Sequence, residues 1–119
     1  MASILFAAAC SANPTACETN ACVCAAGESC SYVCAPGSAC DVQCAPGEPC
    51  DVTCDAGQVC HVECSGATSC KVDCNSGPEC HVTAPATNAT VTDCPAGSCV
   101  VACGEVGQAT RSGTTATCP

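Results

Sequence analysis

One ten-residue sequence is repeated five times from residue 30 to residue 79, and a sixth copy begins at Cys80. The consensus of these copies is C-x-V-x-C-x-x-G-x-x. A fixed short period of this kind is typical of solenoids and other repeat arrays. The repeat therefore constrains the fold more than any other feature of the chain.

Each repeat has the pattern of a short strand followed by a turn. In C-x-V-x-C the Cys and Val residues alternate with variable residues, which places Cys, Val and Cys on one face of a strand. The second half contains Pro followed by Gly at Pro36-Gly37 and at Pro46-Gly47, which is typical of a type II turn. We therefore expect an all-β fold.

Two assemblies of these strands are consistent with the pattern. In a disulfide-braced meander, the Cys-Val-Cys faces would all lie on one side of a single sheet, with nothing to cover them. A parallel β-solenoid turns the same faces inward and stacks each coil on the next. We expect the solenoid, with one ten-residue repeat per coil and about seven or eight coils. The meander is the alternative.

The repeat domain is expected to span residues 22–103. Before it, residues 10–21 have the composition of a linker, and residues 1–9 form a short apolar run ahead of Cys10. This run is similar to the end of a bacterial lipoprotein signal, which makes Cys10 a candidate for lipidation; an apolar terminus without this role is the alternative. After the repeats, residues 104–119 are expected to form a C-terminal cap or tail.

The large number of cysteines predicts covalent bracing. The chain has 19 Cys but only one Phe, one Tyr and no Trp, so it lacks the large side chains of an ordinary core. Small proteins without such a core are held by disulfides, which persist in oxidising, extracytoplasmic compartments. We therefore expect the protein to be secreted or to lie in the cell envelope.

The spacing of the cysteines favours pairing across the turns. Cys30 and Cys34, at the two ends of one strand, would be roughly 13 Å apart, beyond the roughly 7 Å limit for bridged Cα atoms. Where the pattern fails, Ala84 and Thr90 stand at both ends of one turn, as if one bridge had been lost as a unit. Bridges between stacked neighbours such as Cys40 and Cys50 are an alternative within reach.

The expected pairs are Cys17–Cys22, Cys24–Cys30, Cys34–Cys40, Cys44–Cys50, Cys54–Cys60, Cys64–Cys70, Cys74–Cys80, Cys94–Cys99 and Cys103–Cys118. Cys10 is left over, which is consistent with its lipidation.

The variable positions of the strands form two rows of outward-facing side chains, which we expect to be the interaction surface. The first row contains Ser31, Asp41, Asp51, His61, Lys71 and His81, and the second contains Val33, Gln43, Thr53, Glu63, Asp73 and Thr83.

These rows offer little for catalysis or for a cofactor. An acid–base pair such as His61 with Glu63 would lie on a convex, solvated face, whereas active sites need a concave pocket. With one repeat per coil, His61 and His81 would be roughly 10 Å apart, too far to share one metal ion. Asp41 and Asp51 are weak candidates for a surface cation site, since Ca²⁺ takes six or more oxygen ligands. We expect no enzymatic activity and no cofactor.

The net charge of −9, with Lys71 and Arg111 as the only basic residues, excludes nucleic acid as a partner because phosphates are bound by Lys and Arg. Anionic membrane surfaces are disfavoured for the same reason, so membrane contact is expected only through a lipid anchor. The sequence does not specify the partner; an envelope or extracellular protein or glycan is consistent with it.

Three resemblances bear on function. The C-x-V-x-C-x-x-G repeats and the leading Cys10 resemble the Cys-rich tandem-repeat lipoproteins of myxobacteria and their relatives, which implies an envelope location and no particular activity. The short Cys-braced coils resemble the β-solenoids of insect hyperactive antifreeze proteins, but those present regular rows of Thr or Tyr. The Cys content resembles that of metallothioneins, although Cys22 to Cys24 is the one C-x-C.

We therefore expect a non-enzymatic, disulfide-stabilised repeat protein with a structural, adhesive or protein-interaction role. Binding of metal ions by Cys thiolates is the alternative, and ice binding is a minor one.

Overall fold

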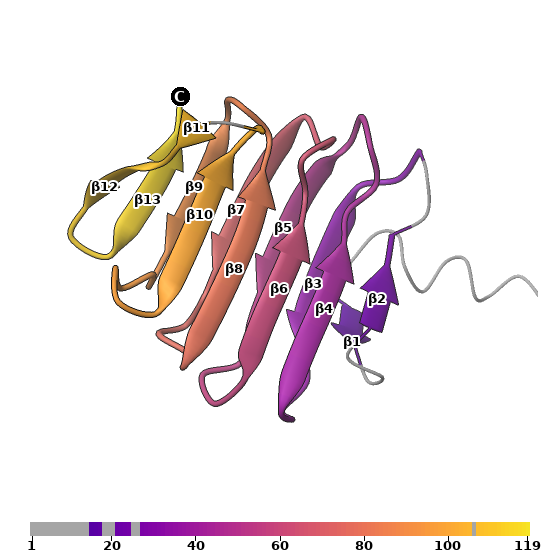
Figure 1. Ribbon diagram of the computed structural model, residues 1–119. Coiled ribbons are helices and arrows are strands. Elements are labelled where there is room, and N and C mark those ends of the chain that lie inside the picture. The colour runs from indigo at the N-terminus through magenta and orange to yellow at the C-terminus, as the bar shows by residue number, and fades with distance from the viewer. Residues whose placement is uncertain (1–14, 18–20, 25–26, 106) are drawn as a thin grey trace, which may run out of the picture.

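The computed structural model describes residues 15–17, 21–24, 27–105 and 107–119 (Figure 1). These residues form a parallel β-solenoid of about four turns, with no helix among them. The predicted fold class is confirmed. Cys10 and the apolar run before it lie outside the described residues.

The strands form two facing sheets, which are visible as two layers in Figure 1 and are parallel except at the C-terminal end. The first, sheet A, contains in spatial order β1 (Thr15–Cys17), β3 (Cys30–Cys34), β5 (Pro49–Thr53), β7 (Ser69–Asp73), β9 (Ala89–Thr92), β13 (Thr115–Cys118) and β12 (Thr110–Ser112). The second, sheet B, contains β2 (Ala21–Val23), β4 (Ala39–Gln43), β6 (Val59–Glu63), β8 (Glu79–Ala84), β10 (Cys99–Cys103) and β11 (Gly107–Gln108).

The coil is twice as long as the sequence repeat. Cys30 is in register with Cys50 in sheet A, and Cys40 is in register with Cys60 in sheet B. One coil therefore holds two repeats, one in each sheet, and the predicted ten-residue coil and count of seven or eight coils are wrong. The physical reason is burial, because two opposed Cys-Val-Cys faces cover each other.

The interior follows the predicted alternation. Val42, Val52, Val62 and Val72 are almost completely buried, and the cysteines on either side of each are buried or nearly so. Where the consensus valine is absent, Tyr32 fills the same inward position. Of the two predicted Pro-Gly turns, the one at Pro46-Gly47 is confirmed, since the φ of +79° at Gly47 is a conformation that only Gly adopts without strain. Residues 36–38 form a bend instead.

Eight of the predicted disulfides are confirmed, with Cα–Cα distances between 5.1 and 6.3 Å. The first seven cross a turn from the end of one strand to the start of the next, and all eight join sheet A to sheet B. Cys22 is also disulfide-bonded, but its predicted partner, Cys17, has a side chain outside the described residues. The bridges run in two rows, one along each edge of the solenoid.

One row is interrupted by two alanines. Ala84 is in register with Cys103, and Ala89 is in register with both Cys70 and Cys118, so Ala84 and Ala89 occupy the place of a bridge. The prediction that Thr90 is the missing half is wrong, since the shift from Cys70 to Ala89 is nineteen residues rather than twenty. Both alanines are buried, at 0% and 3% exposure.

The C-terminal residues reverse direction and cover the last coil. β13 pairs antiparallel with β9, β12 pairs antiparallel with β13, and β11 pairs antiparallel with β10. The bridge from Cys103 to Cys118 holds this segment to sheet B. Residues 107–119 are therefore a cap on the end of the solenoid.

The interrupted row generates a test. Replacing both alanines (Ala84→Cys with Ala89→Cys) should create a further bridge, because Cys94 and Cys99 are also five residues apart and their Cα atoms lie at 5.1 Å. Closing so short a loop should raise the free energy of unfolding by about 2 kcal/mol, measured by guanidinium denaturation.

The matched control is Ala84→Ser with Ala89→Ser. Its side chains have a volume similar to that of Cys but cannot form a bridge. Two more free thiols in the cysteine variant than in the parent chain, or a rearranged disulfide map, would show that the two positions do not face each other.

Candidate functional site

The outward-facing side chains divide between the two sheets. Because consecutive repeats lie in opposite sheets, the predicted rows are not continuous. Sheet B presents Asp41, Gln43, His61, Glu63, His81 and Thr83. Sheet A presents Ser31, Val33, Asp51, Thr53, Lys71 and Asp73.

This division excludes the predicted pairing of Asp41 with Asp51. Asp41 lies on β4 beside His61, whereas Asp51 lies on β5 between Ser31 and Lys71. The two carboxylates point away from opposite sheets, with the valine core between them. They cannot contribute oxygen atoms to one cation.

The same division brings together two residues that were expected to be far apart. His61 and His81 are in register on the neighbouring strands β6 and β8, and their ring centroids are 5.1 Å apart. The expected separation of two coils is wrong because twenty residues make one coil rather than two. Both rings are exposed on sheet B.

Glu79 completes this group, which we call the histidine cluster (His61, His81 and Glu79). The carboxylate Oε2 of Glu79 lies 3.0 Å from Nε2 of His81, and both side chains are about half exposed, at 51% and 48%. One ligand atom from each of the three residues lies within 4.8 Å of the other two.

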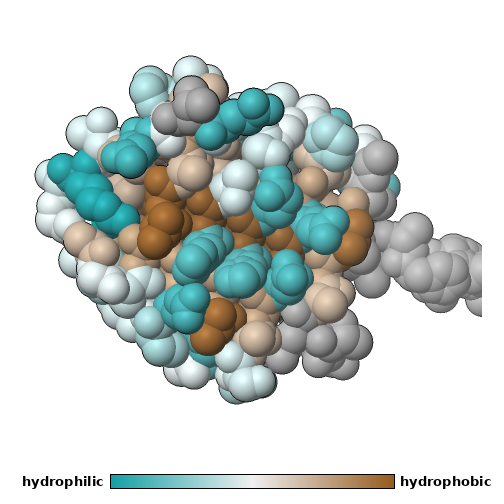
Figure 2. Space-filling view, in the orientation of Figure 1, coloured by the Kyte–Doolittle hydropathy of each residue, from teal (hydrophilic) through white to brown (hydrophobic). Residues whose placement is uncertain are grey.

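The surroundings of the cluster are acidic. Asp41, His61, Glu63, His81 and Thr83 line one hollow in the face of sheet B. Figure 2, which shows the molecule from this side, has hydrophilic side chains gathered over the middle of the face. A positive ion at this hollow would be attracted by the carboxylates of Asp41 and Glu63.

The predicted acid–base pair of His61 with Glu63 is not supported by the hydrogen bonds of the described residues. Both residues face outward on β6, but the carboxylate of Glu63 accepts hydrogen bonds from the hydroxyl and the backbone N–H of Ser65. The histidine that interacts with a carboxylate is instead His81, through Glu79.

Two carboxylates lie close together where strands of sheet A end: Asp73 is the last residue of β7, and Asp93 directly follows β9. A hydrogen bond with the Asp73 side chain, the negative charge of Asp73 and partial desolvation together raise the pKa of Asp93. Asp73 also accepts a hydrogen bond from the backbone N–H of Asn75 at 2.8 Å. This pair is a site of charge repulsion at neutral pH.

The sulfur atoms of neighbouring bridges lie close to one another. Cys30 approaches the Cys44–Cys50 bridge, Cys34 approaches Cys54–Cys60, and Cys99 approaches Cys74–Cys80. The Sγ atoms of Cys74 and Cys99 are 3.5 Å apart. Metal ions bind thiolates rather than disulfides, so these groups are ligand sets only in a reduced chain.

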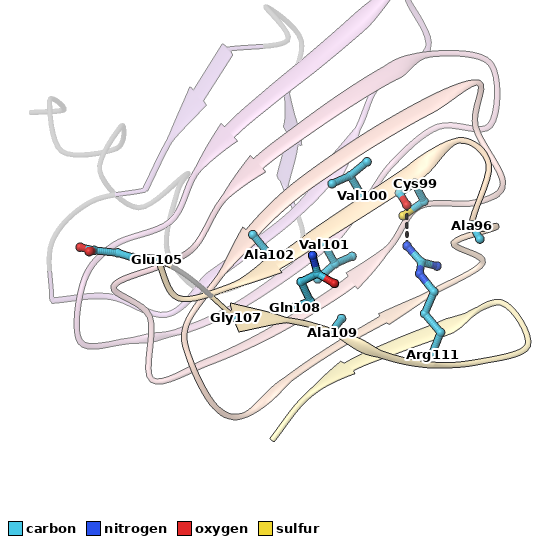
Figure 3. Close-up of a pocket in the computed structure, with 10 residues that line it drawn as sticks. All are labelled: Ala96, Cys99, Val100, Val101, Ala102, Glu105, Gly107, Gln108, Ala109 and Arg111. Carbon is cyan, nitrogen blue, oxygen red and sulfur yellow. Dashed lines mark hydrogen bonds between the residues drawn. The ribbon is translucent and has the colours of Figure 1, made fainter.

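A hollow at the C-terminal end has a structural explanation. It is lined by residues of β10 and the cap, including Arg111 (Figure 3). The guanidinium of Arg111 donates hydrogen bonds to the backbone carbonyls of Cys94, at 2.8 Å, and Cys99. Arg111 therefore fastens the cap to the last turn.

Comparisons with protein-family models, with curated proteins and with solved structures find no match to this chain. The site is therefore interpreted from its own geometry.

Sequence reasoning missed Glu79 and Asp93. The ten-residue pattern places Glu79 in the turn half of its repeat, although the segment Glu79-Cys80-His81 has the alternation that places Glu79 and His81 on one face. Asp93 lies where the repeat is one residue short. It is close to Asp73 because β9 pairs with β7 at a spacing of nineteen residues, and the regular ten-residue period does not predict this spacing.

The carboxylate pair on sheet A predicts a pH dependence. Because the pKa of Asp93 is raised in the folded state, its ionised form destabilises the fold at neutral pH and its protonated form does not. Asp93→Asn should therefore raise the denaturation midpoint at pH 7. The gain should disappear as the pH falls towards 3, where Asp93 is protonated in the parent chain.

Asp51→Asn, on the same sheet but beside Lys71, is the control and should give no gain at pH 7. If Asp93→Asn raises the denaturation midpoint equally at every pH, charge repulsion is not the cause of the gain. The cause would then be the backbone φ of 49° at this position.

Proposed function

We propose that this protein is a non-enzymatic, disulfide-braced scaffold of the cell envelope or the extracellular space, which acts by presenting its exposed sheet faces to a partner. The observation that carries the proposal is the state of the cysteines. All those whose side chains the structure describes are disulfide-bonded. This number of bridges indicates an oxidising, extracytoplasmic environment.

The placement of the polar side chains supports a non-enzymatic role. The carboxylates and histidines of the described residues lie on the outer faces of the two sheets and in the turns, and none of them is buried; the histidine cluster and the Asp73–Asp93 pair are their closest groupings. Catalysis depends on positioned groups in a site that excludes water. Open, solvated sheet faces are better suited to contacts with another surface.

Retention in the envelope is proposed to depend on Cys10, which the pairing scheme leaves over. Among the described residues, no helix is long and apolar enough to cross a membrane. A lipid on Cys10 would hold the solenoid at a membrane surface, with its acidic faces free to contact an envelope protein or glycan. Two attached chains, or one chain with a second contact, give stable anchoring.

Thiolate metal binding is the second candidate, and it is favoured by the sulfur groups described above. Three sets of three cysteines have sulfur atoms within 4.8 Å of one another, which is close enough to surround Zn²⁺ or Cu⁺ after reduction. Ice binding is less well supported, because each exposed row mixes acidic, basic and neutral residues.

Cell fractionation tests the proposal. The full chain, produced in its own host, should be found in the envelope fraction, and its intact mass should be two hydrogens lower for every bridge, with no bound metal. Cys10→Ala should release the chain into the soluble extracytoplasmic fraction, whereas the neighbouring Ser11→Ala should not. Beads coated with the released, oxidised chain should retain isolated envelopes.

A cytoplasmic chain with free thiols and several equivalents of zinc or copper would refute the scaffold and support thiolate binding. Envelope location without retention of envelopes by the coated beads would refute the adhesive role.

A further inference from the structure

We propose that His61, His81 and Glu79 form a surface binding site for one divalent transition-metal ion, of the class represented by Zn²⁺. This inference is independent of the proposed scaffold role, but it requires the disulfides that hold the strands in place. It rests on the arrangement of the three side chains, on the charge around them and on the rigidity of the strands that carry them.

The two imidazoles are placed side by side by the fold. The chain contains two histidines, which are twenty residues apart, the length of one coil. They therefore occupy equivalent positions on β6 and β8, where they are in register. Imidazole is the side chain that Zn²⁺, Cu²⁺ and Ni²⁺ share as a preferred ligand.

The distances are compatible with one ion. Zn–N and Zn–O bonds are about 2.0–2.1 Å long, so two ligand atoms of a tetrahedral ion are about 3.3 Å apart. Nε2 of His81 and Oε2 of Glu79 are already 3.0 Å apart. The ligand atoms of all three residues lie within 4.8 Å, so small rotations of the exposed rings bring the nitrogen atom of His61 into range.

Two histidines and one carboxylate form a recognised ligand set for Zn²⁺, with a fourth position left to water. The half-exposed side chains leave that position open to solvent. The site is therefore expected to bind the ion reversibly rather than to enclose it.

The electrostatic environment favours a cation. Asp41 lies beside His61 on the next strand, and Asp41 and Glu63 line the same hollow as the two histidines. Lys71, the nearest basic residue in sequence, lies on the opposite sheet. The formal net charge of the chain is −9, which adds a long-range attraction for positive ions.

The backbone of the site is held by covalent bonds. β6 lies between the bridges Cys54–Cys60 and Cys64–Cys70, and β8 begins at the bridge Cys74–Cys80. Cys60 and Cys80, the residues directly before the two histidines, are in register. Because the strands are fixed before the ion arrives, binding orders only three side chains.

Isothermal titration calorimetry of the oxidised full chain with ZnCl₂, at pH 7.5 in a buffer that does not chelate metals, tests the site. We expect one ion per chain. His61→Ala, His81→Ala and Glu79→Gln each remove a ligand, so each should weaken binding by about tenfold or more, since the loss of a group that only supports a ligand already costs about that much. Asp51→Asn, on sheet A, should leave it unchanged.

The most specific control is a variant with the same number of histidines as the parent chain. Ser31→His combined with His61→Ser keeps two histidines but places them on opposite sheets, since Ser31 lies on β3. Binding should be lost, while the far-UV circular dichroism and intact mass should show the same fold and the same bridges. Imidazole ¹⁵N shifts of His61 and His81 should change together on addition of Zn²⁺.

Absence of binding would overturn the proposal. Equal binding by the parent chain and the variant with relocated histidine, or displacement of Zn²⁺ by excess Ca²⁺, would also overturn it, because these results would assign the ion to carboxylates elsewhere on the acidic surface.

Discussion

The disulfides that join the two sheets are the interaction on which the rest of the structure depends. The buried side chains are almost entirely Val, Cys and Ala, with Tyr32 as the one aromatic residue among the described core positions. Such side chains bury little apolar area, and ordering each residue costs about 1–2 kcal/mol of backbone entropy. Each bridge lowers the entropy of the unfolded chain instead.

The cysteines have two roles at once. In each coil, they fill the interior next to the valines, and their bonds fix the distance between the two sheets. The bridges therefore determine both how thick the core is and where each strand begins. A sequence with few large apolar residues can form a regular solenoid because these two roles fall on the same side chains.

The regular register has a consequence for the surface. Residues twenty positions apart become neighbours on one face, so any side chain that recurs at this spacing forms a row. His61 and His81 are the example with the clearest chemistry. The valines and bridges beneath the exposed positions hold the strands in place. The exposed side chains can therefore be replaced, and different binding groups can be placed on either face, without loss of the fold.

Much of this fold could be predicted from the sequence, because strand alternation and turn residues leave local signals. The bridges could be predicted from the joint loss of two cysteines around one turn. The length of the coil could not, since a ten-residue period has the same pattern whether one repeat or two make a coil. Because of this single ambiguity, the sequence predicts that His61 and His81 are far apart and that Asp41 and Asp51 are neighbours. The roles of Ala89 and Asp93 could not be predicted for a related reason. The repeat is one residue short before them, and the sequence alone does not show which residues then become neighbours in the sheet.

The most direct test of this account is reduction under native conditions. The oxidised chain is treated with tris(2-carboxyethyl)phosphine at 25 °C and neutral pH, its thiols are blocked, and its far-UV circular dichroism and amide hydrogen exchange are recorded. If the bridges replace the core, the β-sheet signal and the protection of β3 to β10 should both be lost. A fully reduced and blocked chain that keeps its β-sheet signal and its protected amides would contradict the account.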